Sequence, residues 1–219
     1  MRAVSSTART HLAAGRLVTM SPVVDALVFV GGESRRMGSD KARLQFADGP
    51  LLARVVRAVS HFDSVTLVGG RPDLIELGTS ELSSSQLSLG HVADRFPGEG
   101  PLGAMISGMS ALSGDVVLAV ACDLPELSRS YVDLLVAQRA LSDADLCVPL
   151  IGGIRQWHCA VWHRRTAEHL TRAFDDGERS VFRAARGLTE VTSTTERVSV
   201  LRDLDSPEDV QRFLDSHAP

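Results

Sequence analysis

The sequence predicts an α/β protein with a three-layer α/β/α architecture and a Rossmann-like, mostly parallel sheet. Short β-branched apolar runs alternate along the chain with segments of helical spacing, which favours parallel strands covered on both faces. Several of these runs end at paired glycines or at an acidic residue. The 219 residues and the 44% hydrophobic content suit one core of ordinary globular size.

The first elements form one β-α-β unit. The apolar run at 23–30 ends at Gly31-Gly32 and predicts a buried strand. Residues 51–62 have apolar positions at helical spacing. A second strand is predicted at 64–68, where the run again ends at a glycine pair, Gly69-Gly70.

The middle of the chain continues the alternation. A Ser-rich stretch at 80–88 predicts a surface loop, and a short strand follows at 89–93. Residues 102–112 and 130–141 are helical in pattern, and they flank the most strand-like run of the chain, at 115–121.

The last third adds three strand candidates and three helices. The final helix has the best-specified start, because Ser206 precedes Pro207 and acids fill the first turn. The strand candidates are 145–150, 159–162 and 197–201, and the helical patterns are 164–175, 180–187 and the segment that begins at Ser206-Pro207.

We predict a single domain at 22–216, preceded by a disordered N-terminal extension at 1–21. The extension contains three arginines and no acid, and Met20 stands directly before the first strand-like run. A net charge of −4 and a pI near 6.0 argue against a nucleic-acid partner.

Three cysteines without zinc or redox spacing favour a reducing cytoplasm. No apolar run approaches the roughly 20 residues that a membrane span needs, so no membrane association is expected. The protein is expected to be a monomer or a weak oligomer.

Ligands of open parallel sheets bind beyond the carboxyl ends of the strands. The segment after the first strand, GGESRRMGSDK at 31–41, combines glycines that admit a ligand with Arg35, Arg36 and Lys41 for phosphates. It has neither Walker A nor GxGxxG spacing. It therefore suits a nucleoside triphosphate, and the alternative is a glycine turn with solvated basic residues.

Asp123 follows the central apolar run directly and precedes Leu-Pro. A carboxylate at this edge can bind Mg²⁺, which uses one or two carboxylates together with phosphate oxygens and water. The alternative is a residue that caps a turn. Two further segments lie at the same predicted edge, 94–102 and 203–207.

The segment GGESRRMGSDK resembles the GGxSxRMGxDK signature of the MobA-type molybdenum cofactor guanylyltransferases, which have the nucleotide-diphospho-sugar transferase-like fold. The resemblance runs from about residue 24 to 214. Its other motifs are Asp94 with GPLGAM, CDLP at 122–125, RQWHCAVWHRR at 155–165, DGERSVFRAAR at 176–186 and DLDSPEDV at 203–210.

The resemblance implies transfer of GMP from GTP to Mo-molybdopterin with Mg²⁺ as cofactor and pyrophosphate as product. It also implies transient contact with molybdenum-insertion proteins or apo-molybdoenzymes. The roles it assigns are catalysis by Arg36, Lys41 and Asp123, nucleotide binding by Phe29, Val30, Gly31, Gly32, Lys41, Asp94 and Asp123, and metal binding by Asp123.

The chain departs from the family pattern at three places. Phe29-Val30 replaces Leu-Ala beside the base pocket, and Gln156-Trp157-His158 replaces Gln-Pro-Leu on the molybdopterin side. Asp203 and Asp205 stand where asparagines are usual, and either can approach the metal or serve only the turn. The rival functions are a CTP-dependent molybdopterin cytidylyltransferase, a nucleotidyltransferase with another acceptor, and a GTP-binding protein without turnover.

Overall fold

A computed structural model describes residues 12–13, 16–17, 22–31, 41–80, 89–195 and 198–217. Strands β1 (Leu12–Ala13) and β2 (Arg16–Leu17) pair antiparallel near the N-terminus. The rest of the predicted extension lies outside the described residues, so its disorder stays a prediction. Among the described residues, no helix combines the length and apolar character that crossing a membrane requires.

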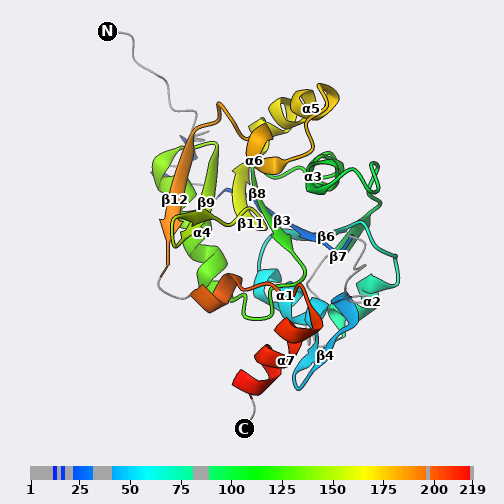
Figure 1. Cartoon of the computed structure of the whole chain (residues 1–219). Coiled ribbons are helices and arrows are strands. Elements are labelled where there is room, and N and C mark those ends of the chain that lie inside the picture. The colour runs from blue at the N-terminus through cyan, green and yellow to red at the C-terminus, as the bar shows by residue number, and fades with distance from the viewer. Residues whose placement is uncertain are drawn as a thin grey trace.

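One sheet of eight strands forms the centre of the described structure (Figure 1). Its order is β10-β9-β11-β8-β3-β6-β7, and β12 pairs with β9. All pairings are parallel except those of β11 and β10. The strands are β3 (Val24–Phe29), β6 (Ser64–Val68), β7 (Leu89–Val92), β8 (Val116–Ala121), β9 (Leu146–Ile151), β10 (Ile154–Arg155), β11 (Cys159–His163) and β12 (Glu190–Thr194).

Helices cover both faces of this sheet. One face packs against α1 (Leu51–Val59), α2 (Leu74–Thr79) and α4 (Arg129–Ser142). The other face packs against α3 (Pro101–Met109), α5 (Ala167–Asp175) and α6 (Val181–Ala184). In Figure 1, α3, α5 and α6 lie above the sheet and α1 and α2 lie below it. The predicted three-layer, mostly parallel α/β fold is confirmed.

Alternating side chains of the strands build the two apolar layers. Along β3, Ala26 and Val28 face the α1 side, whereas Leu27 faces α3. The helix α3 lies very close to the sheet, because a Cβ added at Gly108 would come within 2.8 Å of Leu27 and Val68 side chains. This close contact fixes the position of helix α3 against the sheet.

A small third cluster joins the closing helix to the start of α1. It contains Leu51, Leu204 and Phe213 of α7 (Pro207–Ser216), and Phe46 of the hairpin β4 (Gln45–Phe46) and β5 (Gly49–Pro50) packs against it. A capping box between Ser206 and Asp209 starts α7, as the Ser-Pro pattern predicts.

The predicted strand at 197–201 is wrong. Val198–Leu201 forms a 3₁₀ helix, η3, in which the adjacent residues Val200 and Leu201 are both buried. Strand β12, which the sequence did not predict, already occupies the free side of β9. The buried Val200 and Leu201 instead pack into the core on the α1 side. Residues 81–88 of the predicted Ser-rich loop lie outside the described ranges.

Candidate active site

A cleft with a volume of about 1760 Å³ crosses the sheet at the carboxyl ends of β6, β3 and β8. It also reaches the amino end of β11, because that strand runs in the opposite direction. The predicted site residues that line this cleft are Phe29, Val30, Gly31, Lys41, Asp94 and Asp123. Gly32 and Arg36 lie outside the described residues.

Two glycine-containing turns meet back to back at one side of the cleft. Gly69 has a φ of +76°, and a Cβ added there would lie 3.0 Å from the Cα of Gly31. The hydrogen bond from Val30 N–H to the Val68 carbonyl, 3.0 Å long, joins the two strand ends. Only glycine allows this approach of two main chains, and Gly31 stays exposed beside the buried Gly69.

Asp94 borders the same side of the cleft, after β7. Its Oδ1 accepts a hydrogen bond of 2.9 Å from the Phe96 N–H and one of 3.4 Å from Ser107 Oγ of α3. These bonds fix the carboxylate between the end of β7 and helix α3. Asp94 can therefore present a fixed acceptor to a ligand in the cleft.

Lys41 and Asp123 meet in the middle of the cleft. Lys41 belongs to the 3₁₀ turn η1 (Lys41–Arg43), and its Nζ lies 3.3 Å from Asp123 Oδ2 and 2.7 Å from Asp205 Oδ1. The Lys41 side chain is only 15% exposed. Residues far apart in the sequence thus form one charged cluster.

The pKa values of this cluster follow from burial and from its charges. Burial lowers the pKa of Lys41, but the hydrogen bond that Lys41 donates to Asp205 and the attraction of Asp123 outweigh this effect, so the pKa is raised. Burial raises the pKa of Asp123, the Lys41 ammonium offsets part of that shift, and Asp203 and Asp205 add to it, so the pKa is raised. A cation would relieve this concentration of negative charge.

The main chain of Asp123 is held from two sides. The Cys122 N–H donates to the Phe29 carbonyl at 3.1 Å, and the Leu204 N–H donates to the Asp123 carbonyl at 3.1 Å. Asp123 Oδ1 is buried and has no hydrogen-bond partner within the described residues. Because buried carboxylate oxygens are normally satisfied, Asp123 fits a Mg²⁺ ligand.

The rest of that cation's ligands would come from phosphate and water. Among the described residues, no three His, Cys, Asp or Glu side chains are grouped as a metal-binding set. Magnesium often binds one or two carboxylates and keeps phosphate and water ligands.

The other end of the cleft is aromatic. Trp157, which precedes β11, and Phe182 of α6 both line it, with ring centroids 5.9 Å apart. Behind Trp157 lies the fully buried Trp162, at a centroid distance of 6.1 Å. His158 also lines this end, and its Nε2 donates to the Leu201 carbonyl at 3.1 Å.

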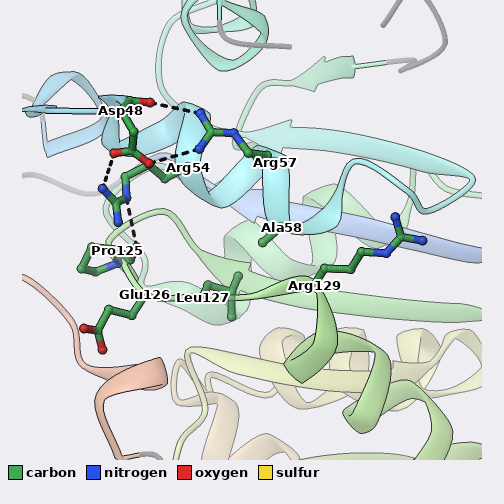
Figure 2. Close-up of a pocket in the computed structure, with 8 residues that line it drawn as sticks. All are labelled: Asp48, Arg54, Arg57, Ala58, Pro125, Glu126, Leu127 and Arg129. Atoms are coloured by element: carbon green, nitrogen blue, oxygen red, sulfur yellow. Dashed lines mark hydrogen bonds and ion pairs between the residues drawn. The ribbon is translucent and has the colours of Figure 1, made fainter. Parts of the chain in front are cut away.

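A second, smaller cavity of about 310 Å³ lies behind the Asp123 loop (Figure 2). Arg54 and Arg57 both turn towards Asp48 there, and Arg54 Nε also donates to the Pro125 carbonyl at 3.1 Å. Arg129 also lines the cavity and lies 3.7 Å from Asp133 Oδ2, so all three arginines of this lining are paired with carboxylates. The hydrogen bond from Arg54 to Pro125 supports the segment that follows Asp123.

Sequence reasoning did not assign a role to some residues of the cleft. Gly69 and Gly70 follow a predicted parallel strand, so the rule of carboxyl ends could have identified them. Phe182 could not be found in this way, because it lies in a helix. Trp157 stands at the amino end of an antiparallel strand, to which that rule does not apply.

Comparisons with known proteins show the family of this chain. Residues 26–191 match the family model of the MobA-like NTP transferase domain. The molybdenum cofactor guanylyltransferase of Vibrio atlanticus (strain LGP32) is 28% identical over 191 residues, which cover 85% of this chain and 93% of that protein. The guanylyltransferase of the same name from Shewanella piezotolerans (strain WP3 / JCM 13877) is 27% identical, over 91% of this chain and 96% of its own.

The fold has a close counterpart among solved structures. The molybdopterin-guanine dinucleotide biosynthesis protein A from Archaeoglobus fulgidus superposes with a TM-score of 0.71 at 18% identity, covering 88% of this chain and 97% of that one. At this identity the likeness shows the fold alone. The family match spans most of the sheet and both halves of the cleft, and the chain therefore belongs to the family of MobA-like NTP transferase domains.

Proposed function

We propose that this protein transfers GMP from GTP to the phosphate of Mo-molybdopterin and releases pyrophosphate. The observation that carries the proposal is the single cleft in which Gly31, Lys41 and Asp123 lie between a glycine-lined half and an aromatic half. The names of the two curated relatives and the family match support it.

The reaction is a substitution at phosphorus. An ionised phosphate oxygen of the acceptor attacks the α-phosphorus of GTP, the bond to the bridging oxygen breaks, and pyrophosphate leaves with the bonding electrons. Because the nucleophile is already ionised, the site needs no strong general base. Positioning of the two substrates and neutralisation of the phosphate charge are sufficient to accelerate the reaction.

Lys41 neutralises charge on the triphosphate in this proposal. Its raised pKa keeps the ammonium protonated at neutral pH. The side chain is mostly buried, so its charge acts in a site of reduced dielectric screening. Arg36, which lies outside the described residues, is proposed to hold phosphates beside it, and Gly32 to admit the guanine.

Asp123 would hold Mg²⁺ through its unpartnered Oδ1. When bound, this ion supplies Lewis-acid neutralisation of phosphate oxygens. Asp123 itself is positioned for the task by the hydrogen bonds of Cys122 and Leu204 on either side. Asp94 and the exposed main chain of Gly31 are proposed to bind the nucleoside part of GTP.

The test is turnover by the purified protein with GTP, Mg²⁺ and Mo-molybdopterin. We expect equal amounts of pyrophosphate and of the guanine dinucleotide. Lys41→Ala and Asp123→Ala should be folded and lose on the order of 100-fold in rate, which corresponds to about 3 kcal/mol of barrier. Near-normal GTP-dependent turnover by either variant would refute the assigned roles.

Calorimetry with GTP, CTP and ATP tests the base. We expect GTP to bind most tightly, and tighter binding of CTP would identify a cytidylyltransferase instead. We propose the cytoplasm as the site of the reaction. Transient contacts with proteins that insert molybdenum or receive the cofactor belong to the same proposal.

A further inference from the structure

The topology of the sheet divides the cleft into two halves. Gly31, Gly69 and Asp94 follow β3, β6 and β7, on one side of Asp123. On the other side, Trp157 precedes β11, and the ring of Phe182 lies beside that of Trp157. Because β8 stands between β11 and β3, Asp123 at its end lies at the boundary between the halves.

The aromatic half is built around one tryptophan. Trp157 is partly buried and is supported from behind by Trp162, whose ring is inclined to it by 39°. Phe182 stands beside it with an inclination of 52° and is 50% exposed. The Arg186 guanidinium lies 5.7 Å from the Phe182 ring and covers part of it. Two rings thus border the cleft from different elements.

Exposed rings in a cleft suit a flat heteroaromatic ligand. Stacking on an aromatic ring gains dispersion and hydrophobic free energy for any planar ring system. The proposed reaction has two such ring systems, guanine and the pterin. The nucleotide is proposed to occupy the glycine-lined half, so its base leaves the aromatic half available to the second ring.

We propose that Trp157 and Phe182 form the binding wall for the pterin ring of the acceptor. This inference rests on the proposed function, and it adds the residues that would select the acceptor. The pterin would pack against Trp157 while its phosphate reaches towards Asp123 at the boundary of the halves. Neither Trp157 nor Phe182 would contact the triphosphate.

The test measures binding of a stable pterin, 6-hydroxymethylpterin, by calorimetry to the full chain, without GTP or turnover. We expect Trp157→Ala to weaken binding about tenfold, and Trp157→Phe, which keeps a ring, to weaken it much less. The control is Ile154→Ala, because Ile154 is an exposed apolar residue of the same hairpin that does not line the cleft. It should bind the pterin like the parent chain.

A second measurement separates the two halves. In Trp157→Ala, the dissociation constant of GTP should stay within about twofold, while the KM for Mo-molybdopterin rises about tenfold with little change in kcat. Phe182→Leu should act in the same direction, and Phe182→Tyr should preserve binding. A circular dichroism spectrum and melting temperature like those of the parent chain would exclude a folding defect.

The experiments distinguish a failure of the aromatic wall from a failure of the proposed GMP transfer. Equal pterin binding by the parent chain and Trp157→Ala, or none by either, would overturn the aromatic wall even if GMP transfer is observed. A shift in GTP affinity alone would assign the rings to the nucleotide and overturn it as well. Trp157-dependent pterin binding without GMP transfer would support the wall and refute the proposed reaction.

Discussion

Lys41 Nζ lies 2.7 Å from Asp205 Oδ1, so the ammonium proposed to meet the triphosphate is held by a carboxylate from the turn before α7. The Lys41 side chain is 15% exposed and that of Asp205 is 60% exposed. Asp205 therefore stands on the solvent side of the pair. An arriving phosphate competes with Asp205 for the same ammonium.

Asp205→Asn tests this competition. The amide can still accept a hydrogen bond from Lys41, but it no longer repels the triphosphate. We expect GTP to bind about two- to fivefold more tightly at low salt, the size typical of an exposed charge interaction, and the difference to shrink at high salt. Calorimetric titration with GTP measures it. Weaker binding by the variant would show that the Asp205 charge assists the nucleotide instead.

Gly69→Ala should disturb the contact between the two glycine turns. A Cβ at this position would lie 3.0 Å from the Cα of Gly31. The backbone there has a φ of +76°, which is strained for alanine. Gly153→Ala is the matched control, since Gly153 has a φ of +82° and nothing within 4 Å of an added Cβ.

We expect Gly153→Ala to cost about 1 kcal/mol of unfolding free energy, from the backbone conformation alone. Gly69→Ala should cost more and should also weaken GTP binding. Urea unfolding and GTP titration measure the two effects. Equal losses of stability, with GTP affinity retained in both variants, would contradict the close contact of Gly69 with Gly31.

Arg54 supports the Asp123 segment from the far side of the site. Its Nε donates to the Pro125 carbonyl (Figure 2). Its guanidinium carbon also lies 5.4 Å from the Phe46 ring centroid and 5.5 Å from that of Phe213. We expect Arg54→Met to lower the unfolding free energy by about 1–3 kcal/mol and to reduce kcat several-fold, with a higher Mg²⁺ requirement.

The control for Arg54 is Arg57→Met, because Arg57 also binds Asp48 but makes no hydrogen bond to Pro125. This variant should lose a little stability and keep kcat. Kinetics at several Mg²⁺ concentrations, with urea unfolding, compare the two. An unchanged kcat in Arg54→Met would restrict Arg54 to a structural role.

Asp145 makes the stability of the chain sensitive to acid. Burial raises its pKa, but hydrogen bonds from the Thr189 main chain and from Arg165 outweigh this and lower the pKa from 3.8 to about 2. A carboxyl whose pKa is depressed by folding stabilises the fold above its unfolded value, and this contribution is lost as pH falls through the folded value.

We therefore expect Asp145→Asn to be less stable than the parent chain at pH 7, and the difference to shrink between about pH 4 and pH 2. The control is Asp175→Asn, because Asp175 is exposed at the end of α5. Unfolding in urea across this pH range gives the result. A constant difference at every pH would show that the carboxylate charge is not its cause.

The sequence predicts the central strands well because they are buried on both faces. The runs at 23–30, 64–68 and 115–121 differ from β3, β6 and β8 by at most one residue at each end. Strand β12 was not predicted because its residues, Glu190–Thr194, are mostly polar and lie at the edge of the sheet. Edge strands lack the continuous apolar run that marks a buried strand.

The candidate site was predictable in part for a similar reason. Parallel strands place Asp94 and Asp123 at one edge, so their positions follow from strand order alone. The ion pair of Lys41 with Asp205 joins residues 164 positions apart, and no periodicity encodes such a contact. The disorder expected for 1–21, outside the short strands β1 and β2, remains a prediction, as do the roles of Gly32 and Arg36.

The reversed direction of β11 has a consequence for how such an enzyme can change. The half of the cleft proposed for the nucleotide is made of turns that follow strands, whereas Trp157 belongs to a hairpin that precedes one. The tip of that hairpin, at 152–157, does not pair with β8, so its exchange would leave in place the hydrogen bonds that hold the strand before Asp123. On the proposed assignment of the two halves, acceptor preference and nucleotide preference would be separable traits. Grafting the hairpin tip between relatives should then transfer the first without the second.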